Sequence, residues 1–222
     1  MLGGGFAWAM IPLLKVLYRE KPEAYSEALH RHSEHFNAHP YLANIALGAV
    51  CRMEEAGRSP EEIRRFKLAV RGPLGSLGDS LVWVGWRPAT VLATLLLALM
   101  GASPGVTVVF FLVLYNLGHL LLRLGGFSLG LEKGSQVGDT LGSLSLPLQA
   151  DRLASLSIFL MGAVLGLVLN RGWGYGGGAM VWGALLVLGL YAGSLLGQGT
   201  WRWNVWTVSG IILILFLLGW AG

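Results

Sequence analysis

Apolar and charged positions divide the chain into three parts. Residues 1–71 mix short apolar stretches with charged ones, which predicts an N-terminal region of amphipathic and interfacial helices. Residues 72–88 are rich in glycine and proline, and residues 89–222 consist mainly of long apolar runs. This pattern predicts a bundle of membrane-spanning helices that follows a more polar helical region.

The first part predicts three short helices before its last, charged helix. Residues 6–18 are too few to cross a membrane, so they predict a helix at the membrane interface or against a partner. Residues 22–39 predict a water-facing helix, which Pro40 stops or kinks. Residues 41–53 predict a short apolar helix that ends before a pair of glutamates.

Glycine and proline then interrupt the helical pattern. Ser59 and Glu62 have the spacing of a capping box, which predicts the start of a helix that leads into residues 72–88. Proline restrains the residue before it, and glycine permits close backbone approach or a positive φ. Irregular backbone at membrane depth is tolerated only where protein covers it or where it lines a watery cavity. The stretch therefore predicts a re-entrant element at a polar site. Its structural motif comprises Gly72, Pro73, Gly75, Gly78, Arg87 and Pro88, with Pro40 at the earlier helix break.

The apolar runs after residue 88 predict about five spans. They cover residues 89–102, 106–122, 153–169, 179–196 and 205–220, and a long loop at residues 123–152 separates the second from the third. A cytoplasmic N-terminus would place the charges of that loop inside, together with Arg202, and would leave Arg171 outside. This distribution follows the positive-inside rule and predicts that the C-terminus is outside.

Composition supports a membrane protein and excludes several other classes. Of 222 residues, 54% are hydrophobic and 13% are charged, and the mean hydropathy is +0.61. A soluble protein has roughly 25% charged residues. The net charge is +4, and eleven of the sixteen basic and nine of the twelve acidic residues lie before Pro88 in one mixed-sign region, so the charge does not indicate nucleic-acid binding. One cysteine excludes an internal disulfide and a cysteine-based metal cluster. The fold class predicted is an all-α integral membrane protein, a polytopic helical bundle with re-entrant or broken helices after an amphipathic N-terminal region.

Isolated polar residues in apolar surroundings are the candidate site residues. Asn37 and His39 lie at a helix break, where an amide and an imidazole suit sugar hydroxyls, although a cap on the next helix better explains Asn37 alone. Asp79 stands alone in the glycine-rich stretch, and an ionisable residue at membrane depth indicates function by default. An N-cap or an ion pair with a nearby arginine is compatible with that role. Asn116 and His119 predict a place in the same cavity or, more favoured, hydrogen bonds between helices.

The histidines raise the alternative of a metal site. His32, His35 and His39 would share one face of a helix, which is geometrically possible for a metal ligand set. The HExxH spacing of zinc proteases is absent, and hydrogen-bonded or exposed histidines are commoner than ligands. We therefore expect no metal and no other cofactor. A stand-alone membrane enzyme that uses a metal remains the less favoured alternative.

Three motifs in a fixed order carry a family resemblance. They are GGFAWAMIPLLKVLY at residues 4–18, RHSEHFNAHPYLANIALGAVCRMEE at residues 31–55 and GPLGSLGDSLVWVGWRP at residues 72–88. The segment FFLVLYNLGHLLLRLGGFSLG at residues 110–130 also fits. With these motifs the chain resembles the IID membrane component of the mannose/fructose/sorbose family of the bacterial phosphoenolpyruvate-dependent sugar phosphotransferase system (PTS).

The resemblance implies a single IID domain in a multi-pass protein of the bacterial inner membrane. Such a subunit pairs with a IIC subunit, in a trimer of IIC–IID pairs surrounded by lipid, and translocates a hexose-type sugar. Cytoplasmic IIA and IIB subunits carry the phosphoryl group on their own histidines, so no catalytic or phosphorylated residue is expected in this chain. Together with this resemblance, we hypothesise that Asn37, His39, Asp79 and Asn116 lie at the substrate pathway or at the partner contact.

The start of the chain supports a second reading of the same resemblance. The family carries a further helical stretch before the motif at residues 4–18, whereas this chain begins almost at the motif. We therefore expect a truncated start or reduced partner contacts. The alternative function is a degenerate IID protein that serves as a regulatory or scaffold subunit.

Overall fold

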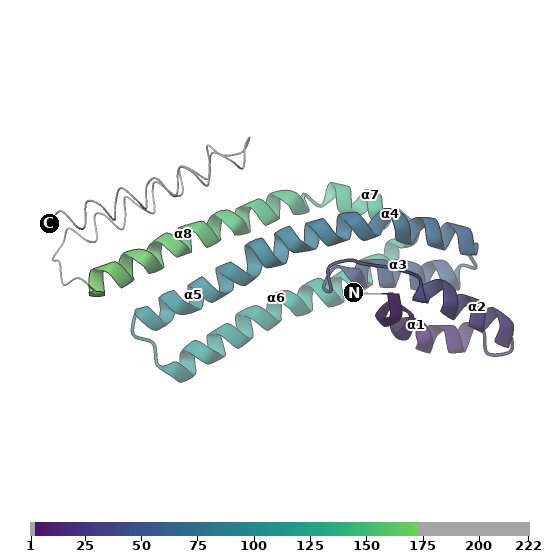
Figure 1. Ribbon diagram of the computed structural model, residues 1–222, viewed down its shortest axis with the longest axis horizontal. Coiled ribbons are helices and arrows are strands. Elements are labelled where there is room, and N and C mark those ends of the chain that lie inside the picture. The colour runs from purple at the N-terminus through teal and green to yellow at the C-terminus, as the bar shows by residue number, and fades with distance from the viewer. Residues whose placement is uncertain (1–2, 173–222) are drawn as a thin grey trace. The chain divides into compact units, whose positions relative to one another are not determined.

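The computed structural model describes residues 3–172, which are helical along most of their length (Figure 1). No β-strand occurs among these residues, which confirms the all-α prediction. The elements in chain order are α1 (Gly3–Leu17), α2 (Pro22–Ser33), α3 (Ala43–Glu55), α4 (Pro60–Gly78), the π-helix η1 (Asp79–Trp86), α5 (Arg87–Leu99), α6 (Pro104–Lys133), the 3₁₀ turn η2 (Gly134–Gln136), α7 (Val137–Ser143) and α8 (Leu146–Gly172).

The helices group into two compact units. Among the described residues, the first comprises the chain up to Val84 together with Tyr115–Ala150, and the second comprises Gly85–Leu114 together with α8 from Asp151. The division of the sequence into residues 1–71, 72–88 and 89–222 stays a prediction. The candidate site residues named below belong to the first unit.

Within residues 3–172, three continuous helical stretches are long and apolar enough to cross a membrane, as the sequence predicts. They are Pro60–Leu99, Pro104–Gly142 and Leu146–Val168. The predicted runs at residues 89–102, 106–122 and 153–169 lie within or at the ends of these stretches. The two remaining predicted spans, residues 179–196 and 205–220, lie outside the described residues.

The glycine-rich stretch does not turn back on itself as the re-entrant prediction requires. Helix α4 runs through Pro73 to Gly78, the chain continues as η1, and α5 begins at Arg87 with Pro88 in its first turn. Leu74, Leu81 and Val82, with Val70 one turn earlier, recur at helical spacing and are buried. Burial of this apolar face outweighs the helix-breaking tendency of one proline and the nearby glycines. The interruption is a change from α to π geometry.

The predicted loop at residues 123–152 is also wrong, because α6 continues to Lys133. Glycines of both helices permit direct contact between α6 and α3: a Cβ atom at Gly130 of α6 would overlap the backbone carbonyl of Ile45, and one at Gly48 of α3 would overlap that of Phe127. Small residues permit such close backbone contact between helices. This contact holds the end of α6 as a helix, and η2, α7 and α8 follow with only short turns between them.

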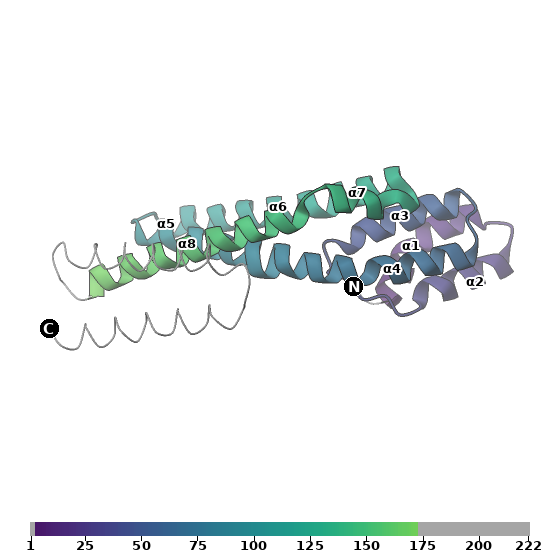
Figure 2. The same cartoon turned by 90° about the horizontal axis from the view of Figure 1, so that it is seen from above.

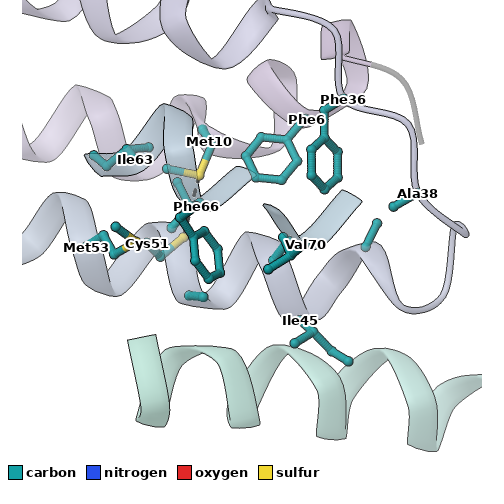
Figure 3. Close-up of a cluster of buried hydrophobic side chains, with 14 of the residues drawn as sticks. Phe6, Met10, Phe36, Ala38, Ile45, Cys51, Met53, Ile63, Phe66 and Val70 are labelled. Carbon is teal, nitrogen blue, oxygen red and sulfur yellow. Dashed lines mark hydrogen bonds between the residues drawn. The ribbon is translucent and has the colours of Figure 1, made fainter. Parts of the chain in front are cut away.

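The three N-terminal helices lie beside α4 (Figure 2), and the buried side chains of the first unit's core join them to it (Figure 3). Phe6, Met10 and Leu14 form one face of α1 and are fully buried. The predicted helix at residues 22–39 ends earlier, at Ser33, because Phe36 leaves the helix and packs against Phe6 with ring centroids 4.8 Å apart. The residues after Ser33 therefore form a loop, residues 34–42, that enters the core.

The capping box at the start of α4 is confirmed. The Ser59 hydroxyl accepts a hydrogen bond from the Glu62 backbone N–H (3.2 Å), and the Glu62 carboxylate accepts one from the Ser59 N–H (3.0 Å). In the described part of the second unit, Ala89 and Leu92 of α5 pack on Leu160 and Val164 of α8.

Candidate functional site

His39 is the buried polar residue of the 34–42 loop, with 3% of its surface exposed. Its Nδ1 accepts a hydrogen bond from the Tyr41 backbone N–H (3.2 Å), which in a neutral ring leaves the proton on Nε2. Burial lowers the pKa of His39, and the Asp79 charge opposes that shift. Nε2 is buried and has no hydrogen-bond partner among residues 3–172. His39 thus holds an unused N–H donor, which is costly to bury and suits a ligand or partner oxygen.

Gly78 makes room for this histidine. A Cβ atom at position 78 would overlap Cβ and Cγ of His39, whereas Cβ atoms at Gly72 and Gly75 would meet open space. Of the three glycines, therefore, only Gly78 is required for close approach. Because Gly78 has no side chain, the His39 ring lies directly against the end of α4, where η1 begins.

Tyr41 connects the loop to one face of α6. Its hydroxyl forms a hydrogen bond with the Tyr115 hydroxyl (2.8 Å), and its ring stacks on His119 with centroids 5.1 Å apart. The Arg123 guanidinium lies 5.0 Å from the Tyr41 ring centroid, a cation–π contact. Tyr115, His119 and Arg123 follow each other at four-residue spacing, so they form a polar stripe on an otherwise apolar helix.

Trp83 of η1 completes what we call the aromatic–histidine cluster, which comprises His39, Tyr41, Trp83, Tyr115 and His119. The Trp83 ring meets His39 edge-on with centroids 5.2 Å apart, and 39% of Trp83 is exposed. π-Helical segments are rare and frequently occur at functional sites. The cluster combines aromatic faces with imidazole and hydroxyl groups, which are the groups that bind polyhydroxylated molecules.

The other predicted site residues lie at different distances from this cluster. Asp79 is exposed at the start of η1 and acts on His39 through its charge. Asn116 is half-buried next to Tyr115 in α6. Asn37 is exposed on the loop and does not cap α3, which begins six residues later at Ala43 without a side-chain cap. An ion pair between Asp79 and Arg87 stays a prediction.

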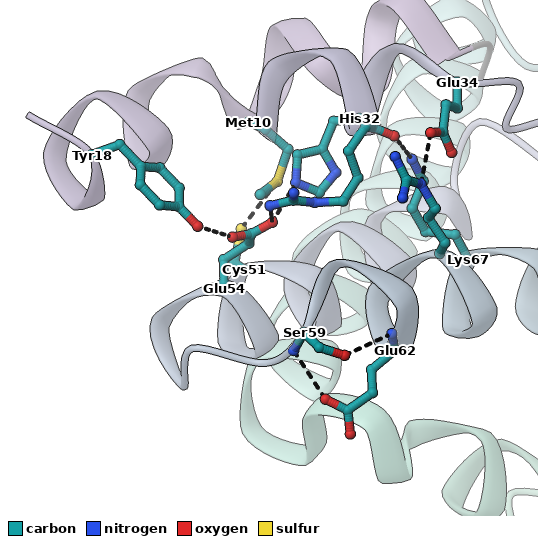
Figure 4. Close-up of polar contacts among 11 residues, drawn as sticks. Met10, Tyr18, His32, Glu34, Cys51, Glu54, Ser59, Glu62 and Lys67 are labelled. Carbon is teal, nitrogen blue, oxygen red and sulfur yellow. Dashed lines mark hydrogen bonds and ion pairs between the residues drawn. The ribbon is translucent and has the colours of Figure 1, made fainter. Parts of the chain in front are cut away.

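A second polar group, the Glu54 hub, comprises Glu54, Tyr18, Arg31 and His32 and ties α3 to α2 and the end of α1 (Figure 4). The Tyr18 hydroxyl donates to Glu54 Oε2 (2.7 Å). Arg31 Nη2 donates to Oε1 (2.7 Å), and His32 Nε2 lies 2.8 Å from the same oxygen. Lys67 of α4 extends the network, because its Nζ donates to the Arg31 carbonyl (2.9 Å).

The electrostatics of the Glu54 hub favour a charged carboxylate and a neutral imidazole. Burial acts to raise the pKa of Glu54, but hydrogen bonds from His32, Arg31 and Tyr18 outweigh it and lower the pKa to about 2. Burial lowers the pKa of His32 and outweighs the opposing effect of Glu54. The hub is therefore a buried ion pair with added hydrogen bonds, which suits a structural role in holding three helices together.

The histidines do not assemble into a metal site in residues 3–172. His32 belongs to the Glu54 hub, His39 belongs to the aromatic–histidine cluster, and His35 is exposed. No group of three histidine, cysteine, aspartate or glutamate side chains in this part of the chain is close enough to hold a metal ion.

Sequence reasoning missed several members of both polar groups. Tyr41, Tyr115 and Arg123 were not among the predicted site residues, although Arg123 is a charge in an apolar helix at helical spacing from His119. That spacing was the available signal. Glu54 gave no such signal, because a glutamate at the end of a short helix is typical of a solvated position.

Comparison with known proteins places the chain among PTS proteins. A family model described as the PTS system mannose/fructose/sorbose family IID component matches residues 1–171. The mannose-specific EIID component of Escherichia coli K12 is 31% identical over 166 residues, which cover 72% of this chain and 58% of that protein. The sorbose-specific EIID component of Klebsiella pneumoniae is 33% identical over 168 residues, 73% of this chain and 60% of that protein.

Two further comparisons agree. The fructose permease IID component of Bacillus subtilis 168 is 31% identical over 166 residues, 72% of this chain and 59% of that protein. The matches thus span less than two thirds of the length of these curated relatives. A solved structure of the mannose transporter ManYZ in complex with microcin E492 has a chain that matches 98% of this chain and 86% of its own length, with 26% identity and a TM-score of 0.55.

Proposed function

Because the chain belongs to the IID component family of the mannose/fructose/sorbose PTS, we propose that it is a membrane subunit of a sugar permease. With a IIC partner it binds and translocates a hexose-type sugar, and cytoplasmic IIA and IIB subunits phosphorylate that sugar. The chain lies in the bacterial inner membrane with its N-terminus in the cytoplasm and its C-terminus outside. The working assembly is a trimer of IIC–IID pairs.

The observation that carries this proposal beyond family membership is the unused N–H donor of His39. A buried donor without a partner costs roughly 1–3 kcal/mol, a cost that a sugar hydroxyl or a IIC carbonyl would remove. The donor belongs to the aromatic–histidine cluster, beside the π-helical segment of a helix long enough to cross a membrane. Binding sites near the membrane midplane in transporters are typically built beside interrupted helices.

The residues of the cluster then have separate roles. His39 donates to the sugar or to IIC, while the Trp83 face contacts the apolar side of a sugar ring. Asp79 orients η1, and its negative charge opposes the effect of burial on the pKa of His39. Asn37 and Asn116 add hydrogen bonds at the pathway or at the partner contact.

The test is sugar uptake by cells whose only copy of this subunit carries a single substitution. Asp79→Ala should abolish uptake while the protein still inserts into the membrane, and His39→Ala should reduce it strongly. Matched controls are Asp139→Ala and His35→Ala, which remove an exposed carboxylate and an exposed imidazole elsewhere. Wild-type uptake by the Asp79→Ala variant would contradict the role of η1. Unchanged uptake in both His39→Ala and Asn37→Ala would mean that the 34–42 loop has only a structural role.

A mild-detergent pull-down of the tagged chain from its native membranes distinguishes a permease subunit from a scaffold protein. Recovery of a second polytopic protein in equal amount, together with uptake, supports the permease. Recovery of that partner without any sugar uptake would instead identify a regulatory subunit. Recovery of the chain alone with bound metal would contradict both functions.

A further inference from the structure

Arg123 borders the aromatic–histidine cluster and takes no part in the proposed contacts with the sugar. Residues 104–122 contain no Asp, Glu, Lys or Arg, so the apolar run of α6 ends at Arg123. Its exposed guanidinium forms no ion pair with any residue in the described range 3–172. A charged side chain in an apolar helix is costly and indicates a function by default. A guanidinium is therefore available beside the candidate site.

The guanidinium of Arg123 lies against the cluster. Its central carbon is 5.0 Å from the centroid of the Tyr41 ring, and the same ring stacks on His119 with centroids 5.1 Å apart. Side chains on a helix lean toward its N-terminus, so Arg123 reaches back over the turn that carries His119. An arginine that only anchored the end of the apolar run would extend away from it, toward water. The contact with Tyr41 instead keeps the guanidinium beside the candidate site.

A negative charge borders the same cluster at a different residue. Asp79 is exposed at the start of η1, and its charge acts on His39. Asp79 and Arg123 do not pair with each other, since no ion pair in the described range includes either of them. His39 and Tyr41 are in contact, with ring centroids 5.1 Å apart. The cluster therefore has an anionic group beside His39 and a cationic group beside Tyr41.

These two charges suit a ligand that has different groups at its two ends. A carboxylate only accepts hydrogen bonds, so it suits sugar hydroxyl groups, whereas a guanidinium only donates and binds anionic oxygens most strongly. The planar guanidinium can bind two oxygens of one phosphate group at once. His39 Nε2 and His119 Nδ1 add buried ring nitrogens that have no hydrogen-bond partner among residues 3–172. A neutral sugar would leave the guanidinium without an anionic partner, whereas a sugar phosphate would supply one.

We propose that Arg123 binds the phosphate group of the phosphorylated sugar, so that the product lies with its hydroxyl groups toward His39 and Asp79 and its phosphate toward Arg123. The inference rests on the proposed function, in which the transported sugar is phosphorylated. Under the proposed topology the carboxyl end of α6 faces the cytoplasm, where the IIA and IIB subunits carry the phosphoryl group. A lipid headgroup would present the same phosphate chemistry, and the lipid arm of the experiment distinguishes the two sources.

The experiment compares binding of a free sugar and of its phosphate ester to the IIC–IID complex in nanodiscs. The probes are mannose and mannose 6-phosphate, with fructose and fructose 6-phosphate as a second pair. Arg123→Gln should weaken binding of the ester about tenfold or more, as for loss of a charged hydrogen bond, and should change binding of the free sugar less than about twofold. Arg123→Lys keeps the charge but not the planar geometry, so it should restore part of the affinity. Arg65→Gln is the matched control, because Arg65 is also exposed and forms no ion pair in the described range but lies on α4.

The outcomes separate this inference from the proposed function. Equal affinity of wild type and Arg123→Gln for the ester would overturn the inference and leave the permease function standing. Equal weakening of both the free sugar and the ester would also overturn it, because Arg123 would then serve the site as a whole. If the wild-type complex binds neither member of either pair and supports no sugar uptake, the proposed function fails as well.

Nanodiscs that contain phosphatidylglycerol provide the lipid arm. If the guanidinium binds lipid phosphate, Arg123→Gln should reduce the phosphatidylglycerol that the purified complex retains and should leave its affinity for the ester unchanged. That pair of results would overturn the inference. Unchanged lipid retention together with weaker binding of the ester would support it.

Discussion

At the scale of single residues, the fit between Gly78 and His39 determines the shape of the candidate site. The imidazole occupies the space that any side chain at position 78 would need, so the helix and the loop can touch only through a glycine. The same contact brings the buried N–H donor of His39 next to Trp83. The observed position of His39 therefore requires a glycine at position 78, and the contact of α4 with the loop requires His39 in that position.

We predict that Gly78→Ala displaces His39 and reduces sugar uptake severely. The added methyl group overlaps the imidazole at its stem, which cannot move as a flexible side-chain end would, and overpacking of this kind costs about 1–3 kcal/mol. Thermal melting in detergent, together with uptake, checks the prediction. Gly75→Ala is the control, since a Cβ there meets open space; equal effects of the two variants would contradict the fit described here.

The Glu54 hub predicts how stability depends on pH. The pKa of Glu54 is about 2 in the folded protein and 4.5 ordinarily, so its stabilisation is complete above pH 4.5 and is lost as the pH falls toward 2. The pKa of His32 lies below its ordinary 6.5, so protonation of the unfolded chain lowers stability as the pH falls through 6.5. Melting temperature in detergent should therefore decrease steadily below pH 6.5.

Removing the carboxylate tests the same hub by mutation. Glu54→Ala leaves the Arg31 charge buried without its partner, and loss of one member of a buried pair costs about 3–5 kcal/mol. Glu54→Gln retains the shape and part of the hydrogen bonding, so it should be less damaging and should flatten the acid side of the melting profile. An unchanged profile in the Gln variant would show that other groups cause the acid sensitivity.

At the scale of elements, close helix contact explains why α6 is longer than its apolar run. The glycine face of α6 rests on the backbone of α3, and burial along this contact extends the helix through a stretch whose composition resembles a loop. The polar stripe of Tyr115, His119 and Arg123 lies on the same helix. Packing of α3 on α6 thus also sets the position of part of the candidate site.

We predict that Gly130→Val separates α3 from α6. A side chain at position 130 would overlap the Ile45 carbonyl, so we expect a loss of about 1–3 kcal/mol and a lower melting temperature. Gly125→Val on the same helix is the matched control, because a Cβ at Gly125 has no neighbour within 4 Å. Both variants carry the same cost of a β-branched residue in a helix, so the difference between their melting temperatures measures the effect of the contact between α3 and α6.

At the scale of the whole molecule, the long helix Pro60–Leu99 joins a charged helical region to an apolar one. In the proposed topology this helix crosses the membrane once, between the N-terminal helices and the turn that joins α5 to α6. Under the proposed orientation, that turn faces outward and the N-terminal helices face the cytoplasm.

Thiol labelling of intact cells tests that orientation. A membrane-impermeant maleimide should label Ser103→Cys in the α5–α6 turn and should label Ser26→Cys on α2 only after the membrane is opened. The native Cys51 does not interfere, because it is buried and its pKa is raised to about 11, so little reactive thiolate is present. Labelling of Ser26→Cys from outside would reverse the proposed topology.

The sequence by itself determined the helical class, the apolar helices, the capping box at Ser59 and the family motifs. These features depend on residues close together in the chain, so local spacing and composition are sufficient to predict them. The functional roles of His39 and Asp79 stay predictions, made from the helix break beside His39 and from the apolar neighbours of Asp79. The sequence did not show that Gly78, and neither Gly72 nor Gly75, is the glycine required for close approach, because that depends on which side chain faces each of them.

Only the tertiary structure decided how distant residues combine. Tyr41 contacts Tyr115 across 74 positions of sequence, and Glu54 bonds to Arg31 and His32 of α2 and to Tyr18 in the turn after α1. The continuation of helix through Pro73 and the change to π geometry at Asp79 likewise depend on burial against other segments. Local propensity differs by about 1 kcal/mol per residue for glycine and about 3 for proline, whereas the packing of an apolar face sums over many contacts, so long-range packing prevails where the two disagree.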